Sequence, residues 1–227
     1  MQTNDNWGEQ ALTVANRFNK EYEGKAFELP AEIEAMPLYQ AWRSGKLQMQ
    51  VASTFWELAQ PKKKQHCLDI GCGLSFLVYP WREWEAFFYG HDVSSVARDA
   101  LMSRGPQLNS KLFKGVKLKA AHHLDIYEPE QFDLAIATGV SCYYSLDYWE
   151  QVLLQVKRIL KPGSYFVFDT VRADTDLAEN WAILETYLGA EVYLEDPADW
   201  LAIIKKVGGK LSGQQENELF QLYRVRF

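Results

Sequence analysis

Residues 66–75 read His-Cys-Leu-Asp-Ile-Gly-Cys-Gly-Leu-Ser and limit the possible folds more than any other stretch of the chain. A short apolar run carries Asp69 near its end and leads directly into a turn that contains Gly71 and Gly73. This pattern predicts a buried strand that enters a glycine turn at the carboxyl edge of an open α/β sheet, where such sheets bind ligands. Because glycine has no side chain and tolerates positive φ, a ligand could approach the backbone closely at this turn.

The spacing of the glycines argues against two phosphate-binding turns. A dinucleotide-binding turn requires G-x-G-x-x-G, and its third glycine would fall at position 76, which is Phe76. A P-loop requires Gly-Lys followed by Ser or Thr, and no such triplet follows Gly73. A phosphate ligand is therefore disfavoured, and with it a nicotinamide-dependent oxidoreductase.

A second acidic residue follows the next apolar run. Residues 86–91 lead to Asp92, about 20 residues after the glycine turn, which is the interval at which a βαβ unit places a carboxylate on a ribose. Asp92 could instead cap a helix that begins near Ser94, since both residue types are good helix caps. The spacing favours ribose binding, and the two roles are compatible.

Two later segments continue the alternation of strand and break. An apolar run begins at Phe132-Asp133 and predicts a fourth strand that ends near Thr138. Residues 160–169, Leu-Lys-Pro-Gly-Ser-Tyr-Phe-Val-Phe-Asp, end a helix at the proline and glycine and open a fifth strand.

Taken in order, these four motifs resemble those of the class I S-adenosylmethionine-dependent methyltransferases. The turn at 69–73 resembles their first motif, and Asp92 resembles their ribose-binding acid. Residues 160–164 resemble their Leu-Lys-Pro-Gly-Gly segment, with Ser164 in place of the second glycine. The resemblance spans residues 69–169, roughly the middle half of the chain.

The resemblance implies a doubly wound α/β sheet of seven strands, mostly parallel, with one antiparallel strand near the C-terminus. Residues 61–227 would form this Rossmann-like catalytic domain, residues 1–60 a helical lid over it, and residues 171–195 a helical insertion over the substrate pocket. We expect the third strand at residues 116–121. A closing hairpin is expected at the C-terminal end, where apolar and charged residues alternate over 219–227.

The implied cofactor is S-adenosylmethionine, and the resemblance assigns it residues at four strand ends and in the lid. An acidic residue after the third strand accepts a hydrogen bond from the adenine in this family, although Asp125 could also simply cap a turn. Arg43 is a candidate partner of the methionine carboxylate, and a surface arginine is an equally good interpretation. The residues expected to hold the cofactor are Asp69, Gly71, Cys72, Gly73, Asp92, Val93, Asp125, Ile126, Thr138 and Arg43.

Methyl transfer from a sulfonium mainly requires that the nucleophile and the methyl carbon be held close and collinear. Residues 138–144 contain neither the N/D-P-P-Y/F motif of many amino-methyltransferases nor the histidine that many small-molecule members carry near position 143. If the acceptor is a phenol, a thiol or an amine, a proton must still leave, and Tyr143, His123 or solvent could take it. Aromatic residues near the expected pocket favour a small-molecule acceptor, aromatic or cationic in character.

Composition excludes several other classes. A net charge of −6 and a pI near 5.3 disfavour a nucleic-acid partner. Three cysteines, Cys67, Cys72 and Cys142, have no C-x-x-C spacing, so neither a disulfide framework nor a metal site is expected. We find no apolar stretch of signal-peptide or bilayer-spanning length, and we expect a cytoplasmic protein, monomer or homodimer.

Two other functions share every cofactor motif and stay open at this point. One is a regulatory protein that binds S-adenosylmethionine without catalysis. The other is a methyltransferase that acts on a protein or an RNA.

Overall fold

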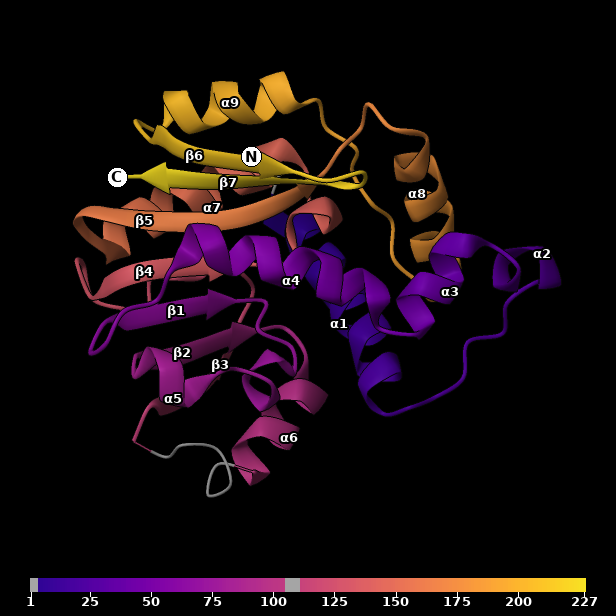
Figure 1. Cartoon of the computed structure of the whole chain (residues 1–227), viewed down its shortest axis with the longest axis horizontal. Coiled ribbons are helices and arrows are strands. Elements are labelled where there is room, and N and C mark those ends of the chain that lie inside the picture. The colour runs from indigo at the N-terminus through magenta and orange to yellow at the C-terminus, as the bar shows by residue number, and fades with distance from the viewer. Residues whose placement is uncertain (1–3, 105–110) are drawn as a thin grey trace.

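The computed structural model describes residues 4–104 and 111–227. They contain a seven-stranded sheet with the order β3-β2-β1-β4-β5-β7-β6 (Figure 1). All neighbouring strands are parallel except β7, which is antiparallel to both β5 and β6. The predicted fold class is confirmed. The strands are β1 (His66–Ile70), β2 (Phe87–Asp92), β3 (Phe113–Leu118), β4 (Phe132–Ala137), β5 (Leu160–Val171), β6 (Lys210–Glu216) and β7 (Phe220–Arg226).

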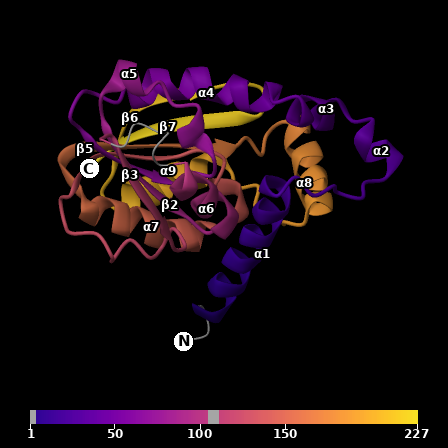
Figure 2. The same ribbon diagram turned by 90° about the horizontal axis from the view of Figure 1, so that it is seen from below.

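Helices cover both faces of the sheet, with α4 and α5 on one face and α7 and α9 on the other (Figure 2). Four more, α1, α2, α3 and α8, gather at the end to which the parallel strands point (Figure 1). The α-helices are α1 (Asn4–Tyr22), α2 (Ala31–Glu34), α3 (Pro37–Arg43), α4 (Lys46–Ala59), α5 (Trp81–Trp84), α6 (Ser95–Ser103), α7 (Leu146–Ile159), α8 (Asp176–Leu188) and α9 (Pro197–Lys206). None of those within the described ranges is long and apolar enough to cross a bilayer.

The sequence patterns account for this layering. Strands β1 and β4 are buried over almost their whole length, as parallel strands between two helical layers must be. Helix α7 buries Trp149, Val152, Val156 and Ile159, which recur at intervals of three or four residues and face the sheet.

The segment after the glycine turn is short and irregular. A 3₁₀ turn over Ser75–Leu77 precedes α5, and no long helix begins at Gly73. Phe76, in the place of a third glycine, is fully buried between Phe88 and Phe113. A helix N-terminus that could face a pyrophosphate is therefore not formed here.

The third strand differs from its prediction. β3 runs from Phe113 to Leu118, three residues earlier than the expected range 116–121. The chain is already in a turn at His122, so residues predicted to lie at the strand's carboxyl end are carried beyond it.

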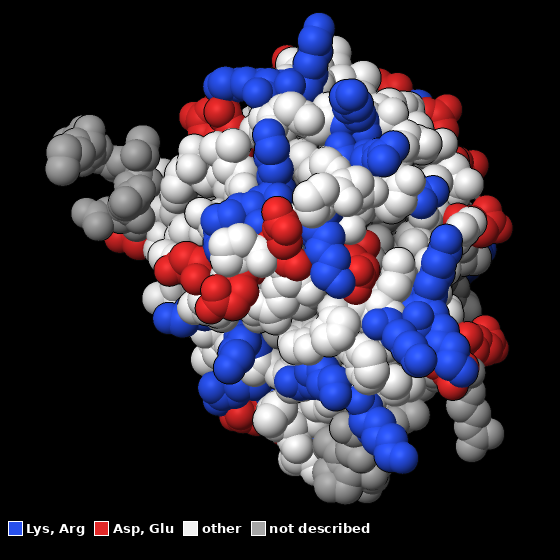
Figure 3. Space-filling view, turned by 90° about the vertical axis from the view of Figure 1, so that its left-hand side faces the viewer, with Lys and Arg blue, Asp and Glu red and all other residues white. Residues whose placement is uncertain are grey.

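The opposite edge of the sheet, where the parallel strands begin, carries many charged side chains. Figure 3 shows that Lys and Arg are interspersed there with Asp and Glu. Two ion pairs lie among residues at these strand starts, Lys63 with Glu85 and Lys161 with Asp133, each with nitrogen and oxygen 2.7 Å apart.

Candidate functional site

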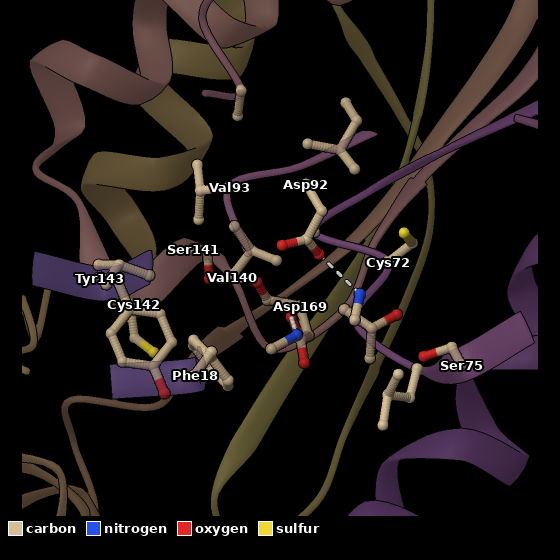
Figure 4. Close-up of a pocket in the computed structure, with 18 of the residues that line it drawn as sticks. Phe18, Cys72, Ser75, Asp92, Val93, Val140, Ser141, Cys142, Tyr143 and Asp169 are labelled. Atoms are coloured by element: carbon tan, nitrogen blue, oxygen red, sulfur yellow. Dashed lines mark hydrogen bonds between the residues drawn. The ribbon is translucent and has the colours of Figure 1, made fainter. Parts of the chain in front are cut away.

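A cavity of about 570 Å³ opens at the carboxyl edge of the parallel strands. The glycine turn after β1 and the ends of β2, β4 and β5 form its base (Figure 4). Side chains of α1, α4 and α8 form its opposite walls. Ligand pockets commonly have volumes of roughly 300–1,000 Å³, so the cavity can hold a molecule of cofactor or substrate size.

The glycine turn requires glycine at two positions. Gly71 and Gly73 have φ angles of 70° and 46°, which side-chain-bearing residues rarely adopt. A Cβ on Gly71 would collide with the side chain of Val140, and one on Gly73 would collide with the hydroxyl of Tyr22 from α1. The turn is therefore a backbone cradle on the floor of the cavity that accommodates only glycine at these two positions.

Asp92 lies beside this cradle and fixes its shape. Its carboxylate accepts a hydrogen bond from the backbone N–H of Gly73 at 2.7 Å (Figure 4) and another from that of Ser94 at 2.6 Å. Ser94 in turn caps α6, because its hydroxyl accepts from the N–H of Ala97 at 3.0 Å. Burial raises the pKa of Asp92 above its usual value. A carboxylate offers about four acceptor positions, so Asp92 can still accept from a ribose.

Asp69 has a supporting position rather than a place in the cavity wall. Its carboxylate accepts a hydrogen bond from the hydroxyl of Tyr79, and it is not among the residues that line the cavity. Burial raises its pKa to about 7. We infer that Asp69 anchors Tyr79, which itself lines the cavity.

The other residues predicted from sequence divide into two groups. Cys72, Val93, Thr138 and Tyr143 line the cavity together with the glycines and Asp92. His123, Asp125, Ile126 and Arg43 lie outside it, and all four are exposed.

The position of Asp125 and Ile126 follows from how their turn is anchored. The guanidinium of Arg158 donates to the carbonyl oxygens of Leu124 at 2.7 Å and Tyr127 at 3.0 Å. Leu124 and Tyr127 are buried, and the two residues between them point outward. The expectation that Asp125 and Ile126 contact the adenine is corrected, and Lys119 and Ala121 line this part of the cavity instead.

Neither His123 nor Tyr143 fits its predicted role of proton acceptor, and both predictions are corrected. The side chain of His123 is 54% exposed and outside the cavity. Tyr143 lines the cavity and packs edge-on against Phe18, but its pKa is raised well above its usual value, first by burial and then by the charge of Glu185. A phenol that stays protonated cannot accept the proton of a substrate.

An ion pair that no sequence motif indicated joins two walls of the cavity. The Nε and Nη2 atoms of Arg17, on α1, donate to both carboxylate oxygens of Glu185, on α8, at 2.8 and 2.9 Å. Their side chains are 1% and 0% exposed. One signal was present in the sequence, because Arg17 follows Val14 at helical spacing on the apolar face of α1. Arg17 thus stands where the lid prediction had placed Arg43, which lies on the surface at the end of α3.

The remaining wall is mostly aromatic and aliphatic. The apolar side chains that line it include those of Phe18, Trp42, Trp56, Val171, Trp181 and Phe220. His91 also lines the cavity, and burial lowers the pKa of its imidazole to about 4, so it is neutral near pH 7. In the part of the chain that the structure covers, His, Cys, Asp and Glu side chains form no cluster suited to a metal ion.

Comparisons with known proteins agree with this geometry. Residues 68–168 match the model of a methyltransferase domain. A sterol 4-C-methyltransferase of Caenorhabditis elegans is 29% identical over 173 residues, which cover 72% of this chain and 48% of that protein. The chain thus spans about half the length of this curated relative.

Solved methyltransferase structures share the fold. The geranyl diphosphate C-methyltransferase of Streptomyces coelicolor, in complex with Mg²⁺, geranyl diphosphate and S-adenosyl-L-homocysteine, has a TM-score of 0.72 at 11% identity, covering 96% of this chain and 97% of that one. The magnesium protoporphyrin IX methyltransferase of Synechocystis, with bound S-adenosylhomocysteine, has a TM-score of 0.65 at 14% identity, covering 96% and 99%. The chain therefore contains a methyltransferase domain at residues 68–168, on a fold that it shares with methyltransferases solved with bound S-adenosylhomocysteine.

Proposed function

We propose that this protein transfers a methyl group from S-adenosylmethionine to a small molecule with a largely apolar body. The observation that carries the proposal is that one cavity joins a nucleoside-binding cradle to an aromatic wall. The cradle is the turn with Gly71 and Gly73, Asp92 lies beside it, and the wall includes Trp56 and Trp181.

The residues at the base of the cavity fit the cofactor. The glycine turn lines the cavity with backbone, and the carboxylate of Asp92 keeps acceptor positions for ribose hydroxyls. Cys72 and Val93 border the same region, and Thr138 lies at the end of β4 beside it. When bound, S-adenosylmethionine supplies an activated methyl group. The protein's share is to hold the reactants in line and to exclude water.

The helices at the open side of the cavity suit the exclusion of water. Helix α1 brings Tyr22 against Gly73 of the glycine turn and Phe18 into the cavity wall, and α8 brings Trp181 into the wall. The buried pair of Arg17 and Glu185 holds these two helices together. We therefore assign the lid function to residues 1–60 together with the insertion at 171–195.

The nature of the wall supports an apolar acceptor. Aromatic side chains bind apolar surface and contribute large contact areas. The acceptors that the relatives' names give, a sterol and geranyl diphosphate, carry extended hydrocarbon parts. An acceptor of this kind would fill the space beside Trp56, Val171 and Phe220.

Turnover with labelled methyl donor tests the proposal. We expect that the purified chain, incubated with methyl-labelled S-adenosylmethionine and a panel of sterols, isoprenoid alcohols, phenols and apolar amines, transfers label to at least one of them and releases S-adenosylhomocysteine. The same panel with basic peptides and RNA checks the macromolecular alternative. Binding of S-adenosylhomocysteine without transfer to any small molecule would contradict the proposal and favour a regulatory binding protein.

A further inference from the structure

One buried carboxylate in the cavity lacks a complete set of partners. Asp169 lies on β5, is 2% exposed and lines the cavity (Figure 4). Its Oδ1 accepts a hydrogen bond from the backbone N–H of Gly139 at 2.8 Å. Its Oδ2 is buried and has no hydrogen-bond partner.

An unpaired carboxylate oxygen in a protein interior needs an explanation. Nearly all buried polar atoms are hydrogen-bonded, because leaving one unpaired costs about 1–3 kcal/mol and more for a charged group. The backbone N–H of Gly139 does not pair with Oδ2, because it already donates to Oδ1. Because Asp169 lines the cavity, we look to a ligand there for the missing partner.

The other acids at the cavity are already engaged. Asp92 accepts from two backbone N–H groups, and Glu185 is bound through both oxygens to Arg17. Glu21 is paired with the same guanidinium. Within the described ranges, Asp169 is the carboxylate at this cavity that keeps a buried, unbound oxygen.

The other bases at the cavity are poor ones. The Nε2 atom of His91 lies 2.9 Å from the carbonyl oxygen of Ala120, and burial lowers its pKa to about 4. Burial raises the pKa of Asp169 to about 7, which suits a group that must accept a proton near neutral pH. Tyr143 stays protonated for the reason given above.

We propose that Oδ2 of Asp169 binds the reacting O–H or N–H group of the methyl acceptor and takes its proton during transfer. This inference rests on the proposed function and narrows the acceptor to a hydroxyl compound or an amine with an apolar body. The acceptor's oxygen or nitrogen forms a bond to the methyl carbon, and the bond from that carbon to sulfur breaks with its electron pair left on sulfur. The acceptor's proton passes to Asp169, so charge and atoms balance.

A matched series of probes tests this role without knowledge of the natural acceptor. The probes are 2-phenylethylamine, 2-phenylethanol and propylbenzene, which share one body and end in an amine, a hydroxyl and a methyl group. Their affinities are measured by tryptophan fluorescence with the protein saturated in S-adenosylhomocysteine. We expect the amine, the alcohol or both to bind at least about 10-fold more tightly than propylbenzene, because a hydrogen bond to a charged group contributes about 1.5–3 kcal/mol.

The isosteric substitution Asp169→Asn should remove that preference and leave propylbenzene binding unchanged. Asp174→Asn is the matched control, since it makes the same change five residues along the chain, at an exposed carboxylate paired with Arg172. This control should keep the wild-type preference. Tighter binding of the amine alone would assign an amine acceptor, and tighter binding of the alcohol a hydroxyl acceptor.

Two results would overturn the role of Asp169. One is a wild-type protein that binds neither polar probe more tightly than propylbenzene, a result that needs no variant to fold. The other is an Asp169→Asn protein that keeps the preference. If S-adenosylhomocysteine does not raise the melting temperature of the wild-type protein, the proposed function itself is contradicted. If it raises the melting temperature but the three probes bind with equal affinity, only the role of Asp169 is refuted.

Discussion

Replacing Arg17 with methionine is expected to lower the free energy of unfolding by about 3–5 kcal/mol, the usual loss when one partner of a buried ion pair is removed. The carboxylate of Glu185 would remain fully buried without the two hydrogen bonds that it now receives. Urea denaturation followed by circular dichroism measures the change.

The double variant Arg17→Met with Glu185→Met tests whether the loss of stability comes from the unpaired charge of Glu185. Because the charge and its partner are removed together, we expect the double variant to be about as stable as the wild type, or more stable. A loss below about 1 kcal/mol in the single variant, or an equal loss in the double variant, would contradict this account of how α1 and α8 are joined.

Replacing Asp92 with asparagine is expected to weaken the binding of S-adenosylhomocysteine by at least about 100-fold, since hydrogen bonds to a charged group contribute about 1.5–3 kcal/mol each. An amide offers one acceptor oxygen, so the N–H of Gly73 or of Ser94 loses its partner. The ribose would lose a charged acceptor at the same time. Isothermal titration calorimetry measures the affinity.

Asp99→Asn provides the control for this substitution. Asp99 lies on α6, the helix that follows Asp92, and its side chain is 68% exposed. We expect its affinity for S-adenosylhomocysteine to match that of the wild type. If Asp92→Asn bound as tightly as this control, the ribose assignment would have to be abandoned.

Much of the fold could be predicted because its signals are local. An apolar run followed by a glycine turn or an acid marks each central strand, and proline or glycine marks the breaks between them. The third strand was placed late because Ala120 and Ala121 extend the apolar pattern beyond Leu118, where β3 ends. Because β3 ends earlier than predicted, Asp125 lies outside the cavity and away from the expected adenine site.

The cavity wall was harder to predict because its contacts join distant parts of the chain. Arg17 and Glu185 are 168 residues apart, and no spacing rule connects them. Asp169 is a different case, because it is an acid near the end of an apolar strand, as Asp69 and Asp92 are. The same rule applied to the fifth strand would have identified it. What the rule could not show is that Asp69 is bound to Tyr79 while Asp169 keeps a free oxygen.

Calorimetric titration of the wild-type protein with S-adenosylhomocysteine tests the nucleoside cradle most directly. The account predicts saturable binding to a single site, with a rise in melting temperature and no competition from NADH. A folded protein that releases no heat with S-adenosylhomocysteine, or that binds NADH at the glycine turn in its place, would contradict it.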